Sequence, residues 1–480
     1  MLNVYNTLSR KKEEFKPLKG KTVSFYQCGP TVYWTQHIGN LRAMVLADLI
    51  VRSLDYLGYK VKFVRNYTDV GHLTSDRDEG EDKLEKAARQ EKLSPKEIAD
   101  KYIKIFESDT RDLNIIEPWR KPRATAYIKE MAKLVQALID GGYAYATDLA
   151  IYFEVKKFKN YNKLSGQNLE KNITDAGKGE VSDPNKKSPL DFALWFFKAG
   201  VHQNALQTWK VKFKNINQPV LEGFPGWHLE CSAMSRKLLG DTLDIHMGGV
   251  EHIPVHHTNE IAQSEAASGK KFVDYWLHNE HLTVDGGKMA KSEGTSYSLA
   301  DIKKKGYDPM VLRYFFLQAH YRSKQNFTWS ALEGAKTALD SIKDKIVETH
   351  CYASKMSTET HVNASLQRRI NEEYRKKFLS AISDDFNIPQ ALAVVFEVIK
   401  ADLPSGDKSA TILDFDKVLG LGLDKIKPIK IPKEVEKLAR ERQKARVDKD
   451  FKKSDRLRDE IDKLGYVVED EKDGYKLKKK

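Results

Sequence analysis

The sequence predicts an α/β protein in which a parallel sheet is split by an insertion and followed by mostly α-helical domains. A strand-prone run at 22–28, an apolar helical pattern at 41–57 and a second strand-prone run at 59–69 form a strand–helix–strand unit, which is typical of a parallel sheet. The same alternation of strand-prone and helix-prone segments resumes at 225–286, and the pattern beyond residue 292 is mostly helical.

The segment between these two α/β regions differs from them in composition. Residues 72–92 predict a charged loop that opens into an exposed helix, and a helix at 122–141 precedes a strand pair at 143–155. Residues 157–188 are rich in Lys, Asn, Gly and Asp. We therefore expect an insertion into the sheet domain there.

The last part of the chain predicts a small helix–hairpin module. A Lys- and Pro-rich linker at 423–434 precedes a charged helix that ends near Gly465, and a hairpin then turns at Asp473 and Gly474. The apolar residues of the helix recur at i, i+4 and i+7, namely Leu457, Ile461 and Leu464.

Composition bounds the class of protein. The 480 residues, 40% of them hydrophobic, predict several packed domains and rule out a disordered chain. No run approaches the roughly 18 apolar residues of a membrane helix, and the N-terminus has no signal-like apolar region. Three cysteines fit a reducing cytoplasm and exclude a disulfide framework. The net charge of +13 fits either nucleic-acid binding or ordinary solvated charge.

Two motifs carry residues that can bind phosphate. His37-Ile38-Gly39-Asn40 follows the first strand at the mouth of the first helix, where unpaired N–H groups attract anions. Gly286-Gly287-Lys288-Met289-Ala290-Lys291-Ser292 sets two lysines three residues apart on a glycine-led loop, where both can neutralise a leaving pyrophosphate. Each motif alone is weak, because the first could be an ordinary turn and the second a solvated surface loop.

A third group of residues has the chemistry of a metal site. Cys28 ends the first strand, Cys231 lies in GWHLEC, and His256 and Glu260 are four residues apart at the start of a predicted helix, which puts them on one face. Two thiolates, an imidazole and a carboxylate can bind Zn²⁺. The spacing lacks a CxxC pattern, so buried structural thiols and surface histidines remain the alternative.

Taken together, these segments resemble the class I aminoacyl-tRNA synthetases, and specifically the cysteinyl-tRNA synthetase family. The resemblance covers essentially the whole chain. Its segments are CGPTVYWTQHIGN (28–40), FVRNYTD (63–69), PRATAYIKEM (122–131), PGWHLECSAMS (225–235), DIHMGGVEHIPVHHTNEIAQSEA (244–266), GGKMAKS (286–292), DDFNIPQALAVVFEVI (384–399) and KDFKKSDRLRDEIDKLGY (449–466).

The resemblance implies a Rossmann-like catalytic domain and several tRNA-binding domains. The segments it implies are the two catalytic halves at 1–111 and 223–292, a connective insertion at 112–222, a stem-contact region at 293–345, a tRNA-binding helical bundle at 346–425 and an anticodon-recognition module at 426–480. The implied protein is a cytoplasmic monomer that has no membrane contact. It binds ATP with Mg²⁺, L-cysteine and a cysteine tRNA.

The resemblance also implies roles for individual residues. ATP binding and catalysis would involve His37, Gly39, Asn40, Lys288 and Lys291, with Ala290 standing where the family usually has serine. One zinc ion would be held by Cys28, Cys231, His256 and Glu260, and would favour the thiolate of cysteine over the hydroxyl of serine. Such discrimination makes an editing domain unnecessary.

Substrate contacts follow from the same resemblance, with two departures from the family pattern. Gly29, Thr68 and Trp227 would surround the substrate cysteine. Glu251 stands where relatives usually have Asp, so its carboxylate is one methylene further from the backbone. The stretch after Thr68 departs from the usual NITDIDDK pattern, and His72 in it is more simply explained as a loop residue than as an additional metal or phosphate ligand.

The implied reaction has two steps. The cysteine carboxylate attacks the α-phosphate of ATP, giving cysteinyl-adenylate, and the 2′-hydroxyl of the terminal tRNA adenosine then attacks the activated carbonyl. Basic groups in the later domains are candidates for phosphate contacts, although each could be a solvated charge: Arg322, Lys324, Arg446, Lys449 and Arg456. Cys351 has no partner motif and is interpreted as incidental.

Three other classes of protein fit parts of these patterns. A related ligase would activate cysteine on the same sheet and transfer it to an amino sugar, but such relatives lack a terminal module like the one at 435–480. A zinc hydrolase would carry an HExxH arrangement, which is absent from the sequence. A pure RNA-binding protein would not need two nucleotide motifs.

Overall fold

The computed structural model describes residues 1–70, 82–167, 183–287, 289, 294–356, 369–426, 431–471 and 474–479. The chain forms two compact units. The first contains residues 1–342 and 366–423, and the second contains residues 343–365 and 424–480. No helix in the described part of the chain is long and apolar enough to cross a membrane.

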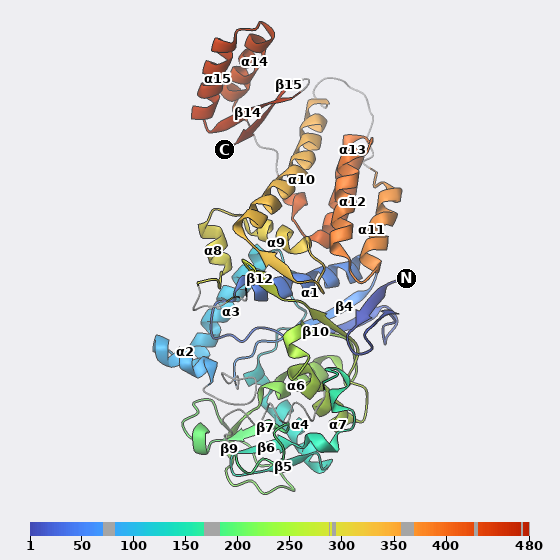
Figure 1. Ribbon diagram of the computed structural model, residues 1–480, viewed down its shortest axis with the longest axis vertical. Coiled ribbons are helices and arrows are strands. Elements are labelled where there is room, and N and C mark those ends of the chain that lie inside the picture. Colours follow the sequence, from blue (N-terminus) through green and yellow to red (C-terminus); the bar gives the residue numbers. More distant parts are fainter. Residues whose placement is uncertain are drawn as a thin grey trace. The chain divides into compact units, whose positions relative to one another are not determined.

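A four-stranded parallel sheet forms the centre of the first unit (Figure 1). Its strands run in the order β11 (Val273–Asn279), β10 (Leu243–Gly249), β3 (Thr22–Gln27) and β4 (Lys60–Arg65). The helix α1 (Ile38–Tyr56) joins β3 to β4, while β10 lies on the other side of β3. The strand order therefore reverses between β3 and β10, where open α/β sheets bind their ligands. The predicted fold class is confirmed.

Helix α1 is held by polar contacts at its N-terminus and near its middle. The side chain of His37 caps its N-terminus by accepting a hydrogen bond from the backbone N–H of Asn40. Further along, the buried carboxylate of Asp48 pairs with Arg52 on the same helix and with the fully buried Arg313 of α9 (Pro309–Leu317). These contacts hold the N-terminus of α1 in a fixed position at the edge of the sheet.

The segment between β4 and β10 is a helical and antiparallel insertion. Helices α2 (Lys83–Glu91) and α3 (Pro95–Asp112), the latter with a Ser94 capping box, come first, and α4 (Ile128–Asp140) follows the short helix η1 (Ala124–Tyr127). A five-stranded antiparallel sheet is then built in the order β5 (Ala144–Ala146), β6 (Ala150–Phe153), β7 (Phe192–Phe197), β9 (Glu222–Pro225) and β8 (Trp209–Lys210).

Two helices return the chain to the parallel sheet. Helix α6 (Trp227–Leu239) follows β9 directly, and α7 (His256–Ser268) joins β10 to β11. They pack against each other and against α4, near the antiparallel sheet in Figure 1. Apolar residues from both sheets and these helices form one core cluster.

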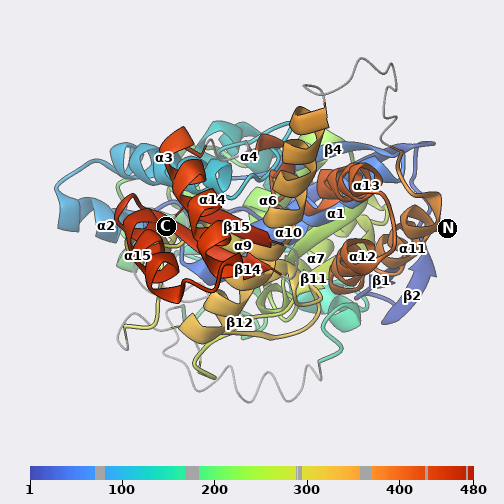
Figure 2. The same ribbon diagram turned by 90° about the horizontal axis from the view of Figure 1, so that it is seen from above.

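The rest of the first unit is mainly helical. The short strands β12 (Leu282–Val284) and β13 (Gln325–Phe327) pair with each other, α8 (Leu299–Lys304) packs on α9, and the part of α10 (Trp329–Met356) up to residue 342 follows. Helices α11 (Glu372–Ser383), α12 (Ile388–Lys400) and α13 (Ser405–Leu419) lie side by side, as Figure 2 shows.

The second unit contains the predicted terminal module. Helices α14 (Lys433–Val447) and α15 (Phe451–Lys463) pack on the antiparallel hairpin of β14 (Tyr466–Glu471) and β15 (Gly474–Lys479). Leu457 and Ile461 are buried as the helical spacing predicts, whereas Leu464 is exposed because α15 ends one residue earlier and Gly465 turns the chain with a positive φ. Asp473 lies outside the described residues.

Candidate functional site

A cavity of about 390 Å³ opens at the carboxyl ends of β3, β4 and β10. It is lined by segments that are far apart in the sequence, which the parallel sheet brings to one edge. Most of the site residues expected from the sequence line it, namely Cys28, Gly29, His37, Asn40, Thr68, Trp227, Cys231, Glu251 and His256.

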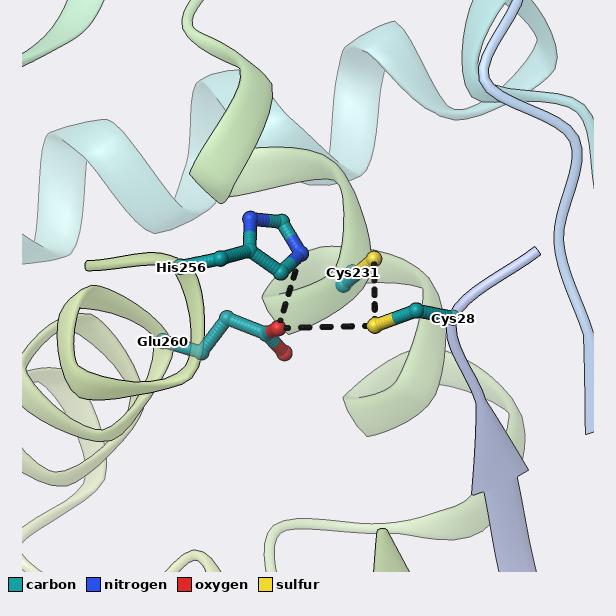
Figure 3. A group of neighbouring side chains, drawn as sticks. All are labelled: Cys28, Cys231, His256 and Glu260. Carbon is teal, nitrogen blue, oxygen red and sulfur yellow. Dashed lines mark hydrogen bonds and ion pairs between the residues drawn. The ribbon is translucent and has the colours of Figure 1, made fainter. Parts of the chain in front are cut away.

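The two cysteines, one histidine and one glutamate converge at the floor of this cavity (Figure 3). Cys28 directly follows β3, Cys231 lies on α6, and His256 and Glu260 come from the first turns of α7. The two sulfurs are 3.8 Å apart, Cys28 Sγ is 3.8 Å from Glu260 Oε1, and His256 Nε2 is 3.0 Å from the same oxygen. One ligand atom from each residue lies within 4.8 Å of all the others.

This donor set fits a zinc ion. Two thiolates bound at about 2.3 Å in tetrahedral geometry lie about 3.8 Å apart, the separation found between Cys28 and Cys231. All four side chains are buried, and Glu260 Oε2 accepts no hydrogen bond. Within the described ranges, Glu260 pairs with histidines and with no lysine or arginine. An ionised carboxylate in such surroundings needs a cation, and without one burial raises its pKa and favours the neutral acid.

Burial also sets the protonation of these groups. The hydrogen bond from Cys28 lowers the pKa of the Cys231 thiol to about 7, while burial raises the pKa of Cys28 and of Glu260 well above their usual values. Burial lowers the pKa of His246 and His257 beside them. These two imidazoles are therefore neutral, the form that binds metal ions, and a bound cation would favour ionisation of the thiol and carboxyl groups.

Several buried histidines around this floor were not predicted from the sequence. His246 on β10 and His257 on α7 each place Nε2 3.4 Å from Cys28 Sγ, so they form a second possible metal group with Cys28 and Glu260. His228 places Nδ1 2.9 Å from Nδ1 of His256, which orients the Nε2 of His256 toward Glu260. His246 comes close to Cys28 because β10 pairs with β3, the strand that Cys28 follows.

Next to the sulfurs, Gly29 and Thr68 are joined by Asn66. The backbone N–H of Gly29 donates to Asn66 Oδ1 at 2.9 Å, and Asn66 Nδ2 donates to Thr68 Oγ1 at 3.3 Å. A Cβ on Gly29 would lie 1.6 Å from the carbonyl oxygen of Asn66, so only glycine fits there. The NYTD motif contained Asn66, but nothing in the sequence distinguished its role from that of Thr68.

Trp227 and Glu251 lie above the cavity floor. The indole of Trp227 stacks on the ring of His256 with centroids 4.3 Å apart. Glu251, on the short helix η5 (Val250–His252), is exposed, and its carboxylate lies close over Gly249 and 3.7 Å from His281 Nδ1.

The two phosphate motifs meet at the N-terminus of α1. The N–H of Ile38 donates to the carbonyl of Tyr297, and a Cβ on Gly39 would lie 2.3 Å from the methyl carbon of Met289. Met289 of the second motif therefore lies against the HIGN turn. Lys288, Ala290, Lys291 and Ser292, as well as His72, lie outside the described residues, and so does the side chain of Cys351.

Three of the basic side chains suggested for tRNA contacts are bonded within the fold. Arg322 binds the buried carboxylate of Asp385, Arg446 pairs with Asp470, and Arg456 pairs with Glu460. The pair at Arg322 is part of the core, because Asp385 is fully buried. Its guanidinium therefore joins the segments around α9 and α12 and is a poor candidate for a freely available phosphate contact.

Comparisons with known proteins identify the family. The family described as "tRNA synthetases class I (C) catalytic domain" matches residues 14–337. A DALR domain matches 377–401, and the cysteinyl-tRNA ligase anticodon binding domain matches 430–475.

Curated relatives match over the full length. Cysteine–tRNA ligase 1 of Burkholderia lata is 41% identical over 99% of this chain and 96% of its own length. Cysteine–tRNA ligase of Treponema denticola is 40% identical over 98% of each chain. A methionyl-tRNA synthetase of Mycobacterium tuberculosis shares the fold, with a TM-score of 0.57, 13% identity and coverage of 84% of this chain and 90% of its own. The chain belongs to the cysteine–tRNA ligase family of class I tRNA synthetases.

Proposed function

We propose that the protein activates L-cysteine with ATP and transfers it to a cysteine tRNA. The observation that carries this proposal is a single cavity that joins a buried Cys/His/Glu group to the nucleotide-binding end of a parallel sheet. We also propose that the protein acts as a monomer in the cytoplasm and that the six segments divide the work as the family resemblance implies.

The proposed metal ligands are Cys28, Cys231, His256 and Glu260. Zinc bound there supplies a soft Lewis acid that favours a thiolate over a hydroxyl ligand. The residues around it form the substrate site: Asn66 accepts a hydrogen bond from the N–H of Gly29 and donates one to the hydroxyl of Thr68, and Trp227 stacks on His256.

ATP is proposed to bind with its phosphates at the N-terminus of α1. His37 caps this helix with Nδ1, and Asn40 lies at its first turn on the exposed rim of the cavity. Gly39 leaves space above the helix that Met289 fills in this conformation. Lys288 and Lys291 flank Met289 in the sequence, and we assign them, with Mg²⁺, to the charge of the departing pyrophosphate.

Positioning and electrostatics are expected to supply most of the rate. The cysteine carboxylate attacks the α-phosphorus of ATP, the bond to the bridging oxygen breaks, and pyrophosphate leaves. The 2′-hydroxyl of the terminal adenosine then attacks the acyl carbon, its proton is lost and AMP leaves. The adenylate is already a good leaving group, so no strong general base is required near the acyl carbon.

The test is ATP–pyrophosphate exchange with cysteine, followed by charging of a cysteine tRNA. We expect exchange that depends on cysteine, with serine at least about 10⁴-fold less effective. Charging by the full chain is then expected with a cysteine tRNA. Exchange without transfer to any tRNA would contradict the synthetase activity and would support the ligase that uses an amino sugar.

A further inference from the structure

Trp34 is an exposed tryptophan on the rim of the cavity. Its side chain is 44% exposed although it lines the same cavity as Cys28 and His37. The indole stacks on the ring of Tyr102 in α3, with centroids 5.9 Å apart and an interplanar angle of 27°. A large aromatic ring exposed at a cavity offers a flat apolar face on which a planar ligand can stack.

The support beneath Trp34 is rigid. Tyr102 is buried, and its hydroxyl donates to Glu91 at the end of α2. The loop that carries Trp34 is tied to the end of β4, because the N–H of Val32 donates to the carbonyl of Thr68 at 3.1 Å. The ring is therefore held in place and loses little conformational freedom when something stacks on it.

Trp34 lies three residues before His37, and its backbone carbonyl accepts a hydrogen bond from Gln36, whose side chain in turn accepts one from Asn40. The sheet order places β4 at one edge, beyond β3, and β10 and β11 on the other side of β3. Met289 and the HIGN turn meet at the N-terminus of α1. The ring of Trp34 stacks on Tyr102 of α3, and Thr68 and Lys83, at the start of α2, line the same cavity.

We propose that Trp34 is the platform on which an unpaired base at the 3′ end of the tRNA stacks when the terminal adenosine enters the cavity. This inference rests on the proposed function, which requires a single-stranded RNA end to reach this cavity. Exposed aromatic rings beside a basic group bind single-stranded nucleic acid by stacking, and they do so without reading its sequence. Lys83 provides the basic group on the same cavity wall.

The experiment separates the two steps of the reaction. Trp34→Ala and Trp34→Phe are compared with the wild type in cysteine-dependent pyrophosphate exchange, which needs no tRNA, and in single-turnover transfer from the adenylate to tRNA. Trp119→Ala is the matched control, because Trp119 is 43% exposed but does not line the cavity. Thermal unfolding confirms that each variant is folded.

We expect Trp34→Ala to lower transfer by roughly 5- to 150-fold, the range for loss of one base–aromatic stack, while exchange changes by less than about twofold. Trp34→Phe should restore most of the transfer, and Trp119→Ala should affect neither step. An increase in the KM for ATP in exchange would overturn the proposal, because Trp34 would then stack on the base of ATP. Equal transfer by Trp34→Ala and the wild type would also overturn it.

A binding measurement tests the proposal without catalysis. The probe is an RNA minihelix with an unpaired CCA end, compared with the same helix with a blunt end. We expect Trp34→Ala to weaken binding of the CCA-ended probe selectively, and equal affinities would contradict the inference. If the wild type charged no tRNA, the proposed function would fail, while this binding difference would still decide the role of Trp34.

Discussion

The cavity floor of the first unit and the terminal module of the second differ in the partners that surround a buried ionisable side chain. In the module, the buried guanidinium of Arg442 is matched by Asp470, which accepts two hydrogen bonds at 2.7 and 3.0 Å. At the cavity floor, Glu260 is buried among thiols and imidazoles, and no lysine or arginine of the described residues pairs with it.

This difference helps to distinguish a charged side chain that stabilises the fold from one that binds a ligand. The pair in the module is complete within the chain, so it needs no ligand. At the cavity floor no lysine or arginine of the described residues accompanies the carboxyl group, and four ligand atoms lie within 4.8 Å of one another, which supports a metal ion independently of family resemblance.

The largest effect is expected from removing one sulfur at the cavity floor. Cys231→Ser should lower the bound zinc and reduce cysteine-dependent exchange by more than about 100-fold, because loss of a ligand should cost more than loss of a residue that only orients a ligand. Zinc content by mass spectrometry and exchange rates check this. Cys351→Ser is the matched control, and normal zinc content in Cys231→Ser would contradict the ligand assignment.

Two glycines of the cavity allow a second, matched comparison. Gly29→Ala places a methyl group against the backbone carbonyl of Asn66, which cannot move aside, and should reduce exchange by roughly 100-fold. Gly39→Ala meets the flexible end of Met289 and should have a smaller effect. Pyrophosphate exchange is measured for both variants. Similar losses of activity would show that the contact with the Asn66 carbonyl does not explain the effect of Gly29→Ala.

Breaking the ion pair of the terminal module should affect stability and tRNA charging but not activation. Asp470→Asn removes the charge that balances the buried Arg442, at a cost of about 1–3 kcal/mol. The thermal unfolding transition of the module should move to a lower temperature. The rate of tRNA charging should fall, while pyrophosphate exchange stays at the wild-type level. A parallel loss of exchange would mean that the two functions cannot be separated in this way.

The smallest effect concerns Asp109, a buried carboxyl on α3 that forms no ion pair with any described residue and does not line the cavity. Its Oδ2 accepts no hydrogen bond, and burial raises its pKa to about 6. Because the folded-state pKa is above the unfolded one, the stability it contributes is complete below about pH 4 and is lost as the pH rises through 6.

Asp109→Asn should therefore stabilise the protein by about 1–2 kcal/mol at pH 8 and have little effect at pH 4. Chemical denaturation at the two pH values measures this difference. An equal effect at both pH values would contradict the pKa argument and would point to a change in packing.

The sequence predicted much of this architecture because local signals were strong. The run at 22–28 and the amphipathic pattern at 41–57 became β3 and α1, and the spacing of His256 and Glu260 put both on one face of α7. Leu464 shows where local reasoning failed, because periodicity alone does not say where a helix ends.

The sequence by itself determined the class of fold, the family and the residue types from which a metal group could be built. Only the tertiary structure brought Cys28, Cys231 and Glu260 to within bonding range of one ion, and only it added His246, His257 and Asn66 to the site. The physical reason is that motifs report local backbone preference, whereas a parallel sheet gathers the ends of distant strands at one edge. The partners of each buried ionisable side chain at that edge therefore depend on which segments the sheet places next to one another.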